Sequence, residues 1–331
     1  MTVMKAAFVE RTGPAETIQV GELPVPAPGP TDVLVQVDAA AVNQVDTYIR
    51  AGLYPTPMPF PFIVGRDLTG TVAEAGPGTP FRAGERVWCN SLGHEGRQGS
   101  CAEFAVVSAE RLYRLPDGGY PVTAVAAFHP GATAFLGLHR RAGIRVHDTL
   151  LIGGAAGSVG SSAVQFAAEA GARVIATARP RDHERCRELG AEAVLDFDDP
   201  DLPARVLDLA PHGVDVCWDT SGRADLNALA PVIGARGRVL LTAGRQGAPP
   251  LSTWAFYTRD ISLVGFVISR ATVDELADAA AAINRRLSGG GLPPRIAEVF
   301  DLEHTAAAHT RVEARAPGRT VVRVREHGSA T

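Results

Sequence analysis

The chain has 331 residues, of which 46% are hydrophobic and 21% charged, and its formal net charge is -4. Because single hydrophobic cores stop growing at about 250–300 residues, this length predicts two domains. The charge balance excludes the strongly basic surface that binds nucleic acid or anionic lipid. We find no apolar signal-peptide core at the start and expect no stretch that could span a bilayer, so we predict a cytoplasmic protein.

Residues 3 to 120 are expected to be rich in β-strand. Short β-branched runs are separated by Pro/Gly clusters such as residues 24–30, which is typical of a small barrel or sandwich. The expected strands are 5–9, 32–39, 70–75 and 102–107. Four well-separated cysteines lie in the chain, without any C-x-x-C pair, and this favours free thiols in a reducing compartment.

From residue 121 the pattern changes to apolar strands that alternate with helices of about a dozen residues. This alternation predicts a parallel, doubly wound sheet. The expected strands are 149–153, 173–177, 193–196, 214–218, 237–242 and 261–266. After a helix over 272–287 and a glycine linker, β-like segments at 294–300 and 319–324 resume the strand-rich pattern of residues 3 to 120. We therefore expect the last forty or so residues to complete the first domain.

A glycine-rich turn follows the strand 149–153 and precedes an amphipathic helix. With the strand 173–177 it forms a βαβ unit of about 30 residues, and its helix N-terminus suits a pyrophosphate. The turn departs from G-x-G-x-x-G, because Ala155 stands where the first glycine would be counted. A turn that binds nothing therefore stays open as an alternative. The predicted pyrophosphate residues are Gly154, Ala155, Ala156, Gly157, Ser158, Val159 and Gly160.

Residues 42–55 read VNQVDTYIRAGLYP. This resembles the V-N-x-x-D-x-Y-I-R-x-G-x-Y-P signature of zeta-crystallin-like quinone oxidoreductases, in the zinc-independent branch of the medium-chain dehydrogenase/reductase superfamily. Matching motifs follow in order, with PGATA at 130–134, LGA at 189–191, DTSG at 219–222 and GRTVV at 318–322.

The resemblance implies an α/β fold in two domains. Residues 1–122 and 288–331 would form a GroES-like, partly open β-barrel catalytic domain. Residues 123–287 would form a doubly wound Rossmann domain that binds the dinucleotide. A ligand cleft would lie where the two domains meet.

The same resemblance predicts that no metal is bound. The Gly-His-Glu of zinc-dependent relatives is replaced by Gly-Arg-Asp at 65–67, and an arginine side chain has no lone pair for zinc. A literal Gly-His-Glu does occur at 93–95, inside the polar loop 90–99. We expect this loop to be exposed or lid-like, although His94 near two cysteines keeps a metal site open as the alternative.

The cofactor is predicted to be NADPH. An arginine at the end of the second strand accommodates a 2′-phosphate, whereas an acid there holds the ribose of NAD. Arg179 stands at this position, with Arg181 and Arg185 nearby, and a guanidinium fork suits a phosphate. Relatives often use a lysine and a tyrosine here, but the only lysine is Lys5 and the tyrosine position is Phe197. The alternative is a solvated basic helix start.

The predicted reaction is hydride transfer from NADPH to a quinone. Without a metal as Lewis acid, the acceptor must already be electrophilic, as quinones and α,β-unsaturated carbonyl compounds are. By resemblance, Asn43 and Thr133 lie at the nicotinamide end, while Tyr48 and Tyr54 line the acceptor cleft. A tyrosine hydroxyl there would stabilise the developing oxyanion. Further cofactor contacts are implied for Ala243, Gly244, Phe266 and Arg319.

Other interpretations remain open. Asn43 could serve only as a helix N-cap, and Tyr48 could be a core residue. The protein could be an NADPH-dependent enoyl or enone reductase, although the lack of lysine disfavours a Lys/Asp proton-donor pair. It could also be a non-catalytic NADPH-binding protein with a structural or RNA-binding role, which the acidic balance disfavours. Relatives often dimerise through the last strand of the nucleotide domain, here residues 261–268, so we expect a homodimer.

Overall fold

The structure is a computed structural model that describes residues 2–118, 120–244, 251–291 and 295–325. Its contacts divide the chain into two units. The split unit comprises Met1–His129 and Thr272–Thr331, and the inserted unit comprises Pro130–Ala271. Position 294, where a strand was expected to begin, lies outside the described residues.

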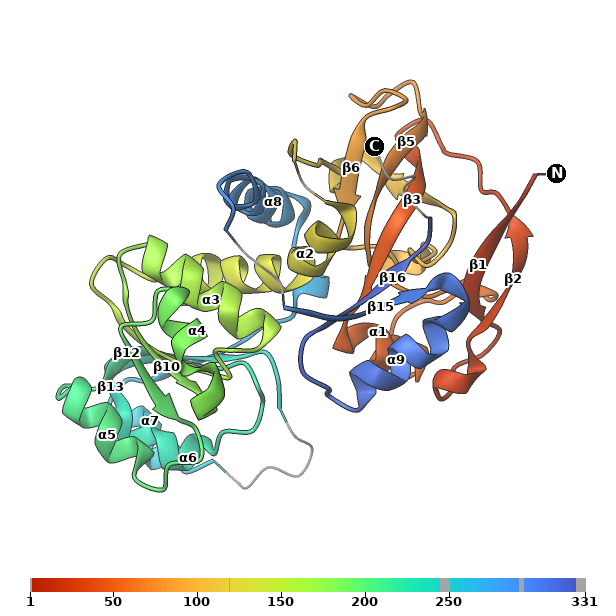
Figure 1. The fold of residues 1–331 in the computed structure, drawn as a ribbon. Coiled ribbons are helices and arrows are strands. Elements are labelled where there is room, and N and C mark those ends of the chain that lie inside the picture. The colour runs from red at the N-terminus through yellow and green to blue at the C-terminus, as the bar shows by residue number, and fades with distance from the viewer. Residues whose placement is uncertain (1, 119, 245–250, 292–294, 326–331) are drawn as a thin grey trace. The chain divides into compact units, whose positions relative to one another are not determined.

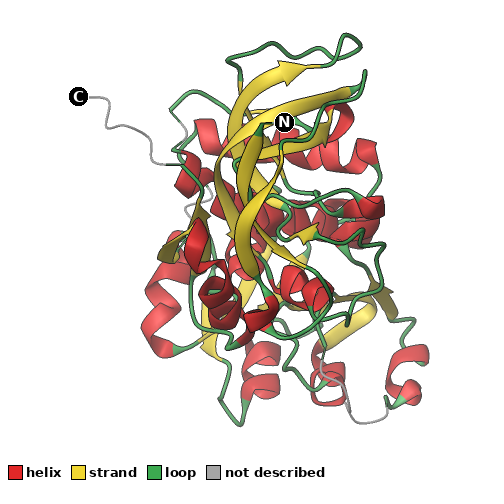
Figure 2. Ribbon diagram, turned by 90° about the vertical axis from the view of Figure 1, so that its right-hand side faces the viewer, coloured by secondary structure: helices red, strands yellow, loops and turns green. Residues whose placement is uncertain are grey.

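Two sheets form the split unit, whose long, twisted strands are drawn yellow in Figure 2. Seven strands form one sheet in the order β15-β16-β3-β5-β6-β8, with β7 also paired to β3, and three form the other in the order β2-β1-β4. The strands are β1 (Val3–Val9), β2 (Gln19–Pro24), β3 (Asp32–Val42), β4 (Phe62–Ile63), β5 (Asp67–Ala75), β6 (Arg86–Cys89), β7 (Phe104–Ser108), β8 (Tyr113–Arg114), β15 (Ile296–Asp301) and β16 (Arg319–Arg323).

The end of the described chain completes the first sheet, as the sequence predicts. In Figure 1 the blue β16 lies beside the orange β3, and the two strands are antiparallel with Thr320 opposite Val42. On the other side of β3, Ala41 lies opposite Asp67 of β5. The C-terminal end of β3 therefore lies between the N-terminal ends of β5 and β16.

The hydrophobic core of the split unit lies on both faces of β3. Val33, Val35 and Val37 belong to one buried cluster, while Ala40 and Val42 belong to another. This division follows the alternation of side chains along a strand. The helices of the unit are α1 (Gln44–Arg50), α8 (Val273–Ser288) and α9 (Thr305–Glu313), with 3-10 turns η1 (Ala15–Thr17), η2 (His94–Gly96), η3 (Ala109–Arg111) and η8 (Leu302–His304).

Helix α8 belongs to the split unit, whereas the predicted boundary at 287/288 placed it with the nucleotide domain. Hydrogen bonds from Asn284 explain the difference. Its Oδ1 accepts from Trp88 Nε1 at 3.0 Å, and its Nδ2 donates to the carbonyl of Arg114 at 3.1 Å. These contacts attach α8 to β6 and β8.

The inserted unit is the doubly wound sheet that the strand–helix alternation predicts. All six strands are parallel, in the order β11-β10-β9-β12-β13-β14, which is the 3-2-1-4-5-6 order of a Rossmann fold. Its strands are β9 (Thr149–Gly153), β10 (Arg173–Ala178), β11 (Ala193–Asp196), β12 (Val214–Asp219), β13 (Ile233–Leu241) and β14 (Ser262–Gly265). Its helices are α3 (Ser158–Glu169), α4 (His183–Glu188), α5 (Leu202–Leu209), α6 (Leu226–Leu229) and α7 (Thr253–Tyr257), with η5 (Pro180–Asp182), η6 (Ala230–Val232) and η7 (Ile268–Arg270).

One long helical stretch runs across the boundary of the two units. Helix α2 (Pro121–Phe135) continues directly into a π-helical turn, η4 (Leu136–Ala142). The expectation that no segment could span a bilayer is wrong by length and composition, because Pro121–Ala142 passes that test. However, 78% of its most apolar window is buried inside the protein, as in the core helix of a globular domain.

His309 on α9 is fully buried and gives the split unit a sensitivity to acid. Among the described residues neither ring nitrogen has a hydrogen-bond partner. Burial, reinforced by the charge of Arg50, lowers its pKa from 6.5 to about 3. The unfolded chain binds a proton at this histidine below pH 6.5, whereas the folded chain does not until about pH 3. The contribution of neutral His309 to the free energy of unfolding is therefore fully present above pH 6.5. As the pH falls below 6.5, about 1.4 kcal/mol of it is lost per pH unit.

We expect His309→Leu to flatten this acid dependence. Between pH 7 and pH 5 the variant should lose about 2 kcal/mol less of its unfolding free energy than the wild type. Urea unfolding at the two pH values measures the difference. The exposed His304 at the start of the same segment provides the control, because His304→Gln should keep the wild-type slope. An unchanged slope in His309→Leu would contradict the assignment.

Candidate active site

Three strand ends of the split unit bring a buried polar cluster together. Asn43 follows β3, Asp67 begins β5 and Arg319 begins β16. An Nη of Arg319 donates to Asn43 Oδ1 at 2.8 Å, and Asn43 Nδ2 donates to Asp67 Oδ2 at 3.1 Å. The same Arg319 nitrogen lies 3.9 Å from Asp67 Oδ2. All three residues are buried, so these contacts are shielded from water.

Asn43 is also the N-cap residue of α1, in agreement with the alternative drawn from the sequence. Its backbone N–H donates to Asp46 Oδ2 at 2.7 Å, as one half of a capping box. The side-chain amide has partners at both ends in Arg319 and Asp67. In the capping box the side chain of Asn43 also accepts from the backbone N–H of Asp46, so three residues hold this amide.

Burial dominates the ionisation of the cluster. It raises the pKa of Asp67 to about 8, although the nearby Arg319 charge opposes the shift. Burial likewise raises the pKa of Asp46 to about 6, against the charge of Arg66. His129, whose Nδ1 lies 3.9 Å from Asp67 Oδ1, has a pKa well below its ordinary value, chiefly through burial. The cluster therefore holds protons that exposed carboxyl groups would have lost at neutral pH.

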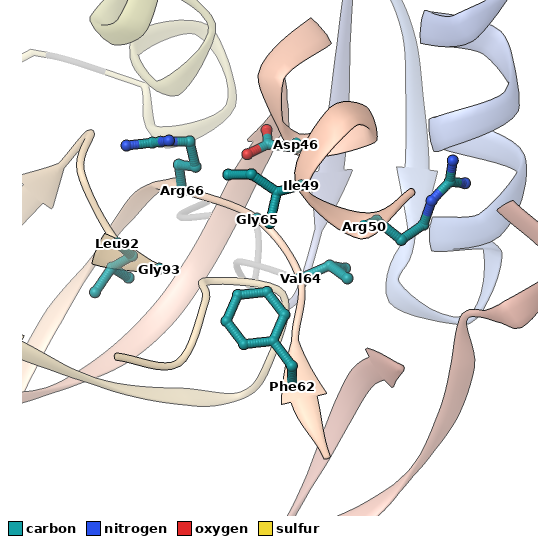
Figure 3. Close-up of a pocket in the computed structure, with 9 residues that line it drawn as sticks. All are labelled: Asp46, Ile49, Arg50, Phe62, Val64, Gly65, Arg66, Leu92 and Gly93. Atoms are coloured by element: carbon teal, nitrogen blue, oxygen red, sulfur yellow. The ribbon is translucent and has the colours of Figure 1, made fainter. Parts of the chain in front are cut away.

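A small cavity lies beside this cluster, and Figure 3 shows Asp46 and Arg66 along its edge. Its volume is about 10 Å³, about the room that one water molecule needs. Sites for organic ligands measure roughly 300–1,000 Å³, so this cavity does not hold an acceptor or a nicotinamide. Arg50 contributes to its wall, but its guanidinium points away to an ion pair with Glu313 of α9. The lining residues are Asp46, Ile49, Arg50, Phe62, Val64, Gly65, Arg66, Leu92 and Gly93.

The loop 90–99 is packed against the protein, which corrects the expectation of an exposed or lid-like loop. The side chain of Gln98 accepts from the backbone N–H of Ile63 at 2.7 Å and donates to the carbonyl of Pro61 at 3.0 Å. Arg97 forms an ion pair with Asp32 at 3.1 Å. The polar composition of the loop predicts exposure to solvent. Instead, its polar side chains bind backbone groups and a charged residue of the protein.

The literal Gly-His-Glu in this loop places His94 and Glu95 on the 3-10 turn η2. Among the residues that the structure describes, no three His, Cys, Asp or Glu side chains converge as metal ligands. Burial lowers the pKa of His94 to about 4. At the family's zinc position stand Arg66 and Asp67, and a guanidinium does not fit as a zinc ligand. The cysteines Cys89, Cys101, Cys186 and Cys217 are all free and buried.

The two tyrosines of the α1 region differ in burial. Tyr48 on α1 is 37% exposed, so it is not the core residue of the alternative interpretation. Tyr54 packs partly against the buried cluster that contains Val42. The backbone N–H groups of Leu53 and Tyr54 both donate to the carbonyl of Tyr48, at 2.9 and 3.3 Å. The turn after α1 therefore fixes the backbone of both tyrosines.

In the inserted unit, the glycine turn between β9 and α3 fits a pyrophosphate. Gly154 has φ +68°, which favours glycine, and Gly157 N–H donates to its carbonyl at 2.9 Å. A Cβ on Gly160 would lie 2.3 Å from the Gly154 carbonyl oxygen, so only glycine allows this approach. No side chain caps the N-terminus of α3 at Gly157. Its first N–H groups can therefore serve an anion.

Arg179 stands directly after β10, as the sequence places it, and is exposed. Its guanidinium lies 6.0 Å from the ring centroid of Phe197, the residue at the family's tyrosine position. Arg181 is exposed beside Asp182, with their charged atoms 3.6 Å apart. Arg185 lies on α4 and is partly buried. Arg179 is therefore the strongest candidate of the three for a phosphate.

The remaining predicted residues also belong to the inserted unit. Thr133 is buried on α2, and the Phe266 ring lies 6.1 Å from that of Trp218. Ala243 packs against Gly222. A Cβ added to Gly222 would lie 2.9 Å from the Cβ of Ala243. Gly244 is the last residue before the undescribed positions 245–250. The two units are described separately, so the structure brings Asn43 and Arg319 together but leaves the rest of the predicted set untested.

Several functional candidates were missed in the sequence. In the sequence, Arg66 and Asp67 stand out only as the residues at the zinc-ligand position of zinc-dependent relatives. In the structure, Asp67 accepts a hydrogen bond from the side chain of Asn43. In the inserted unit, Thr220 Oγ1 donates to the Gly153 carbonyl at 2.8 Å, and Asp219 accepts backbone N–H groups from the loop that follows it. The DTSG motif was the signal, but it gave no indication that this loop buttresses the glycine turn.

Known proteins resemble both units. A model of the alcohol dehydrogenase GroES-like domain matches residues 29–117, and a zinc-binding dehydrogenase model matches residues 158–284. The chain is 27% identical over 314 residues to a quinone oxidoreductase of Pongo abelii, covering 94% of each chain. It is 35% identical over 211 residues to a trans-enoyl reductase of Aspergillus terreus, covering 59% of this chain and 69% of that one. Escherichia coli quinone oxidoreductase complexed with NADPH has a TM-score of 0.83 at 25% identity, covering 98% of this chain and all of that one.

Proposed function

Because this chain belongs to the zeta-crystallin-like quinone oxidoreductase family of the medium-chain dehydrogenase/reductase superfamily, and is therefore an oxidoreductase, we propose that it reduces a quinone with NADPH. The observation that carries this proposal is the glycine turn of the inserted unit, which packs so closely on the N-terminus of α3 that Gly160 has no space for a side chain. Full-length similarity to quinone oxidoreductases supports the acceptor class.

NADPH is the cofactor, and the similar Escherichia coli enzyme is complexed with it. Gly154–Gly160 would hold the pyrophosphate at the N-terminus of α3. An added Cβ would meet the Gly154 carbonyl at 2.3 Å from Gly160 and Thr220 Oγ1 at 3.0 Å from Gly154, so both positions favour glycine. Arg179 would hold the 2′-phosphate. Bound NADPH supplies the hydride. At the nicotinamide end we propose Asn43, Thr133, Ala243, Gly244, Phe266 and Arg319 as the neighbouring residues.

Arg179→Gln should separate the two nicotinamide cofactors. Loss of a charge-assisted contact to the 2′-phosphate costs about 1.5–3 kcal/mol, so the KM for NADPH should rise roughly 10- to 100-fold. The KM for NADH should change little, because NADH has no such phosphate. Arg187→Gln, an exposed arginine on the following helix α4 without a proposed contact, is the matched control. A wild-type preference for NADH would contradict the assignment of NADPH.

The acceptor would be positioned by Tyr48 and Tyr54. A tyrosine hydroxyl can donate to the oxygen on which negative charge develops as hydride adds. No metal is proposed, because Arg66 occupies a position where a ligand would be needed. Conjugation in a quinone makes the acceptor reactive once it is held in place.

A second candidate is an enoyl or enone reductase, which the 35% identity to a trans-enoyl reductase favours. Oxidation of NADPH should be followed with ortho- and para-quinones, enones and enoyl thioesters. We expect the quinones to have the highest kcat/KM. Preferred turnover of enones or enoyl thioesters would establish the second candidate, and turnover of none of them would leave a non-catalytic NADPH-binding protein.

We also propose a cytoplasmic homodimer. Four free, buried cysteines suit a reducing compartment. Strand β14 ends the described sheet of the inserted unit, and Leu263 on it is 40% exposed. Such an edge can pair with its twin about a two-fold axis. A monomeric mass at micromolar concentration would contradict the dimer.

A further inference from the structure

We propose that Asp67 and Arg319 are positioning residues that hold the side-chain amide of Asn43 in one orientation for hydride transfer. The proposal starts from two hydrogen bonds at opposite ends of one amide. Arg319 donates to Asn43 Oδ1 at 2.8 Å, and Asn43 Nδ2 donates to Asp67 Oδ2 at 3.1 Å. No other arrangement of the same three side chains keeps both bonds.

The chemistry of the partners decides which end of the amide is which. A guanidinium carries donors only, so the atom that faces Arg319 must be the oxygen of Asn43. A reversed amide would turn its NH₂ group toward the donors of Arg319 and its oxygen toward the carboxyl of Asp67. Protonation of Asp67 does not remove this preference, because Arg319 cannot become an acceptor. The orientation of the Asn43 amide thus follows from the chemistry of Arg319, which has only donors.

Burial and strand pairing make the orientation rigid. Exposed fractions are 3% for Asn43, 0% for Asp67 and 9% for Arg319. Each residue stands at the end of a strand whose neighbours are fixed by the β3 ladders with β5 and β16. Asp46 also binds the backbone N–H of Asn43 at 2.7 Å. Rotation of the amide would break both hydrogen bonds out of contact with water, and the bond from Arg319 is charge-assisted.

The consequence for catalysis rests on the proposed function, in which Asn43 touches the nicotinamide or the acceptor. Asp67 and Arg319 fix the orientation in which the amide meets that partner. Neighbours that lock the rotamer of a contacting residue are a usual requirement of precise sites. Misplacement by about 1 Å can slow a reaction about 100-fold.

The test variant is Asp67→Leu combined with Arg319→Met. This pair removes both partners of Asn43 together, so neither charge is left buried alone. The matched control is Asp148→Leu with Arg238→Met, because that ion pair, at 2.8 Å, has no contact with Asn43. Two readouts are combined. Hydrogen exchange of the Asn43 side-chain amide is followed by NMR, with the resonance assigned from its loss in Asn43→Asp. Steady-state kinetics supply kcat and KM.

In the wild type and the control we expect slow exchange of the Asn43 amide, and in the test variant fast exchange. The kcat of the test variant should fall about 10- to 100-fold. Fast exchange in the wild type would overturn the proposal, as would an unchanged kcat once the amide is released. If the wild type reduces no acceptor, the proposed function fails and so does the catalytic consequence, while the exchange rates still decide whether the pair holds Asn43. If the test variant does not fold, exchanging the partners as Asn43→Asp with Asp67→Asn replaces it, with restored stability but low kcat expected.

Discussion

Replacing Gly160 with alanine should abolish most of the affinity for NADPH. The added Cβ would lie 2.3 Å from the Gly154 carbonyl oxygen and 2.8 Å from Ala155 Cα, so the turn must move away from α3. Such overpacking costs about 1–3 kcal/mol of stability. The displaced turn would no longer aim the first N–H groups of α3 at the pyrophosphate. We expect the Kd for NADPH to rise at least about 10-fold.

Fluorescence titration with NADPH measures this effect, and Gly21→Ala is its control. A Cβ on Gly21 would meet only the Phe8 ring at 3.5 Å, an ordinary contact on a strand of the split unit. Gly21→Ala should therefore bind NADPH like the wild type. Equal affinity in Gly160→Ala would show that the glycine turn is not the pyrophosphate site.

Arg319→Met alone should destabilise the protein strongly, and more so at high pH. Above the pKa of Asp67, this change leaves a buried carboxylate without its nearest positive charge, which typically costs about 3–5 kcal/mol. Burial raises the pKa of Asp67 to about 8 with Arg319 present, and removal of that charge should raise the pKa further. The stability contribution of the protonated form is fully present below the unfolded pKa of 3.8 and is lost as the pH rises to the folded pKa of about 8. In Arg319→Met, with its higher folded pKa, this loss continues above pH 8.

Urea unfolding at pH 6 and pH 9 checks this expectation. The loss in Arg319→Met should be larger at pH 9, whereas Asp67→Leu with Arg319→Met should be close to wild type at both values. A loss below about 1 kcal/mol at pH 9 would mean that the pair is hydrated and contributes like an exposed ion pair.

The sequence predicted the inserted unit well because its signals are local. The strands at Thr149–Gly153 and Ala193–Asp196 have the predicted bounds, and the sheet is parallel, as the alternation of strands and helices predicts. The return of residues 319–324 to the first sheet was also predicted, and β16 pairs with β3. Each of these strands is predicted from the apolar pattern of a few neighbouring residues.

Long-range polar pairing could not be predicted in the same way. Asp67 and Arg319 each look like ordinary polar residues at a strand start, and only the β3 ladders bring them to Asn43. The loop 90–99 was misjudged because its polar side chains bind backbone groups, as Gln98 does, instead of water. The boundary near α8 was displaced for a similar reason, since Asn284 bonds to distant β6 and β8.

The split arrangement of the first unit has a consequence for biosynthesis. Strand β3 is made early, yet its partner β16 at Arg319–Arg323 is translated only after the whole inserted unit. The inserted unit is continuous from Pro130 to Ala271 and can complete its sheet on the ribosome. Until then, residues 39–42 of β3 lack this partner and stay open to wrong ones, and closing the pair requires a very long loop. Docking of β16 should therefore be a late step in maturation and the point at which a chaperone is most useful.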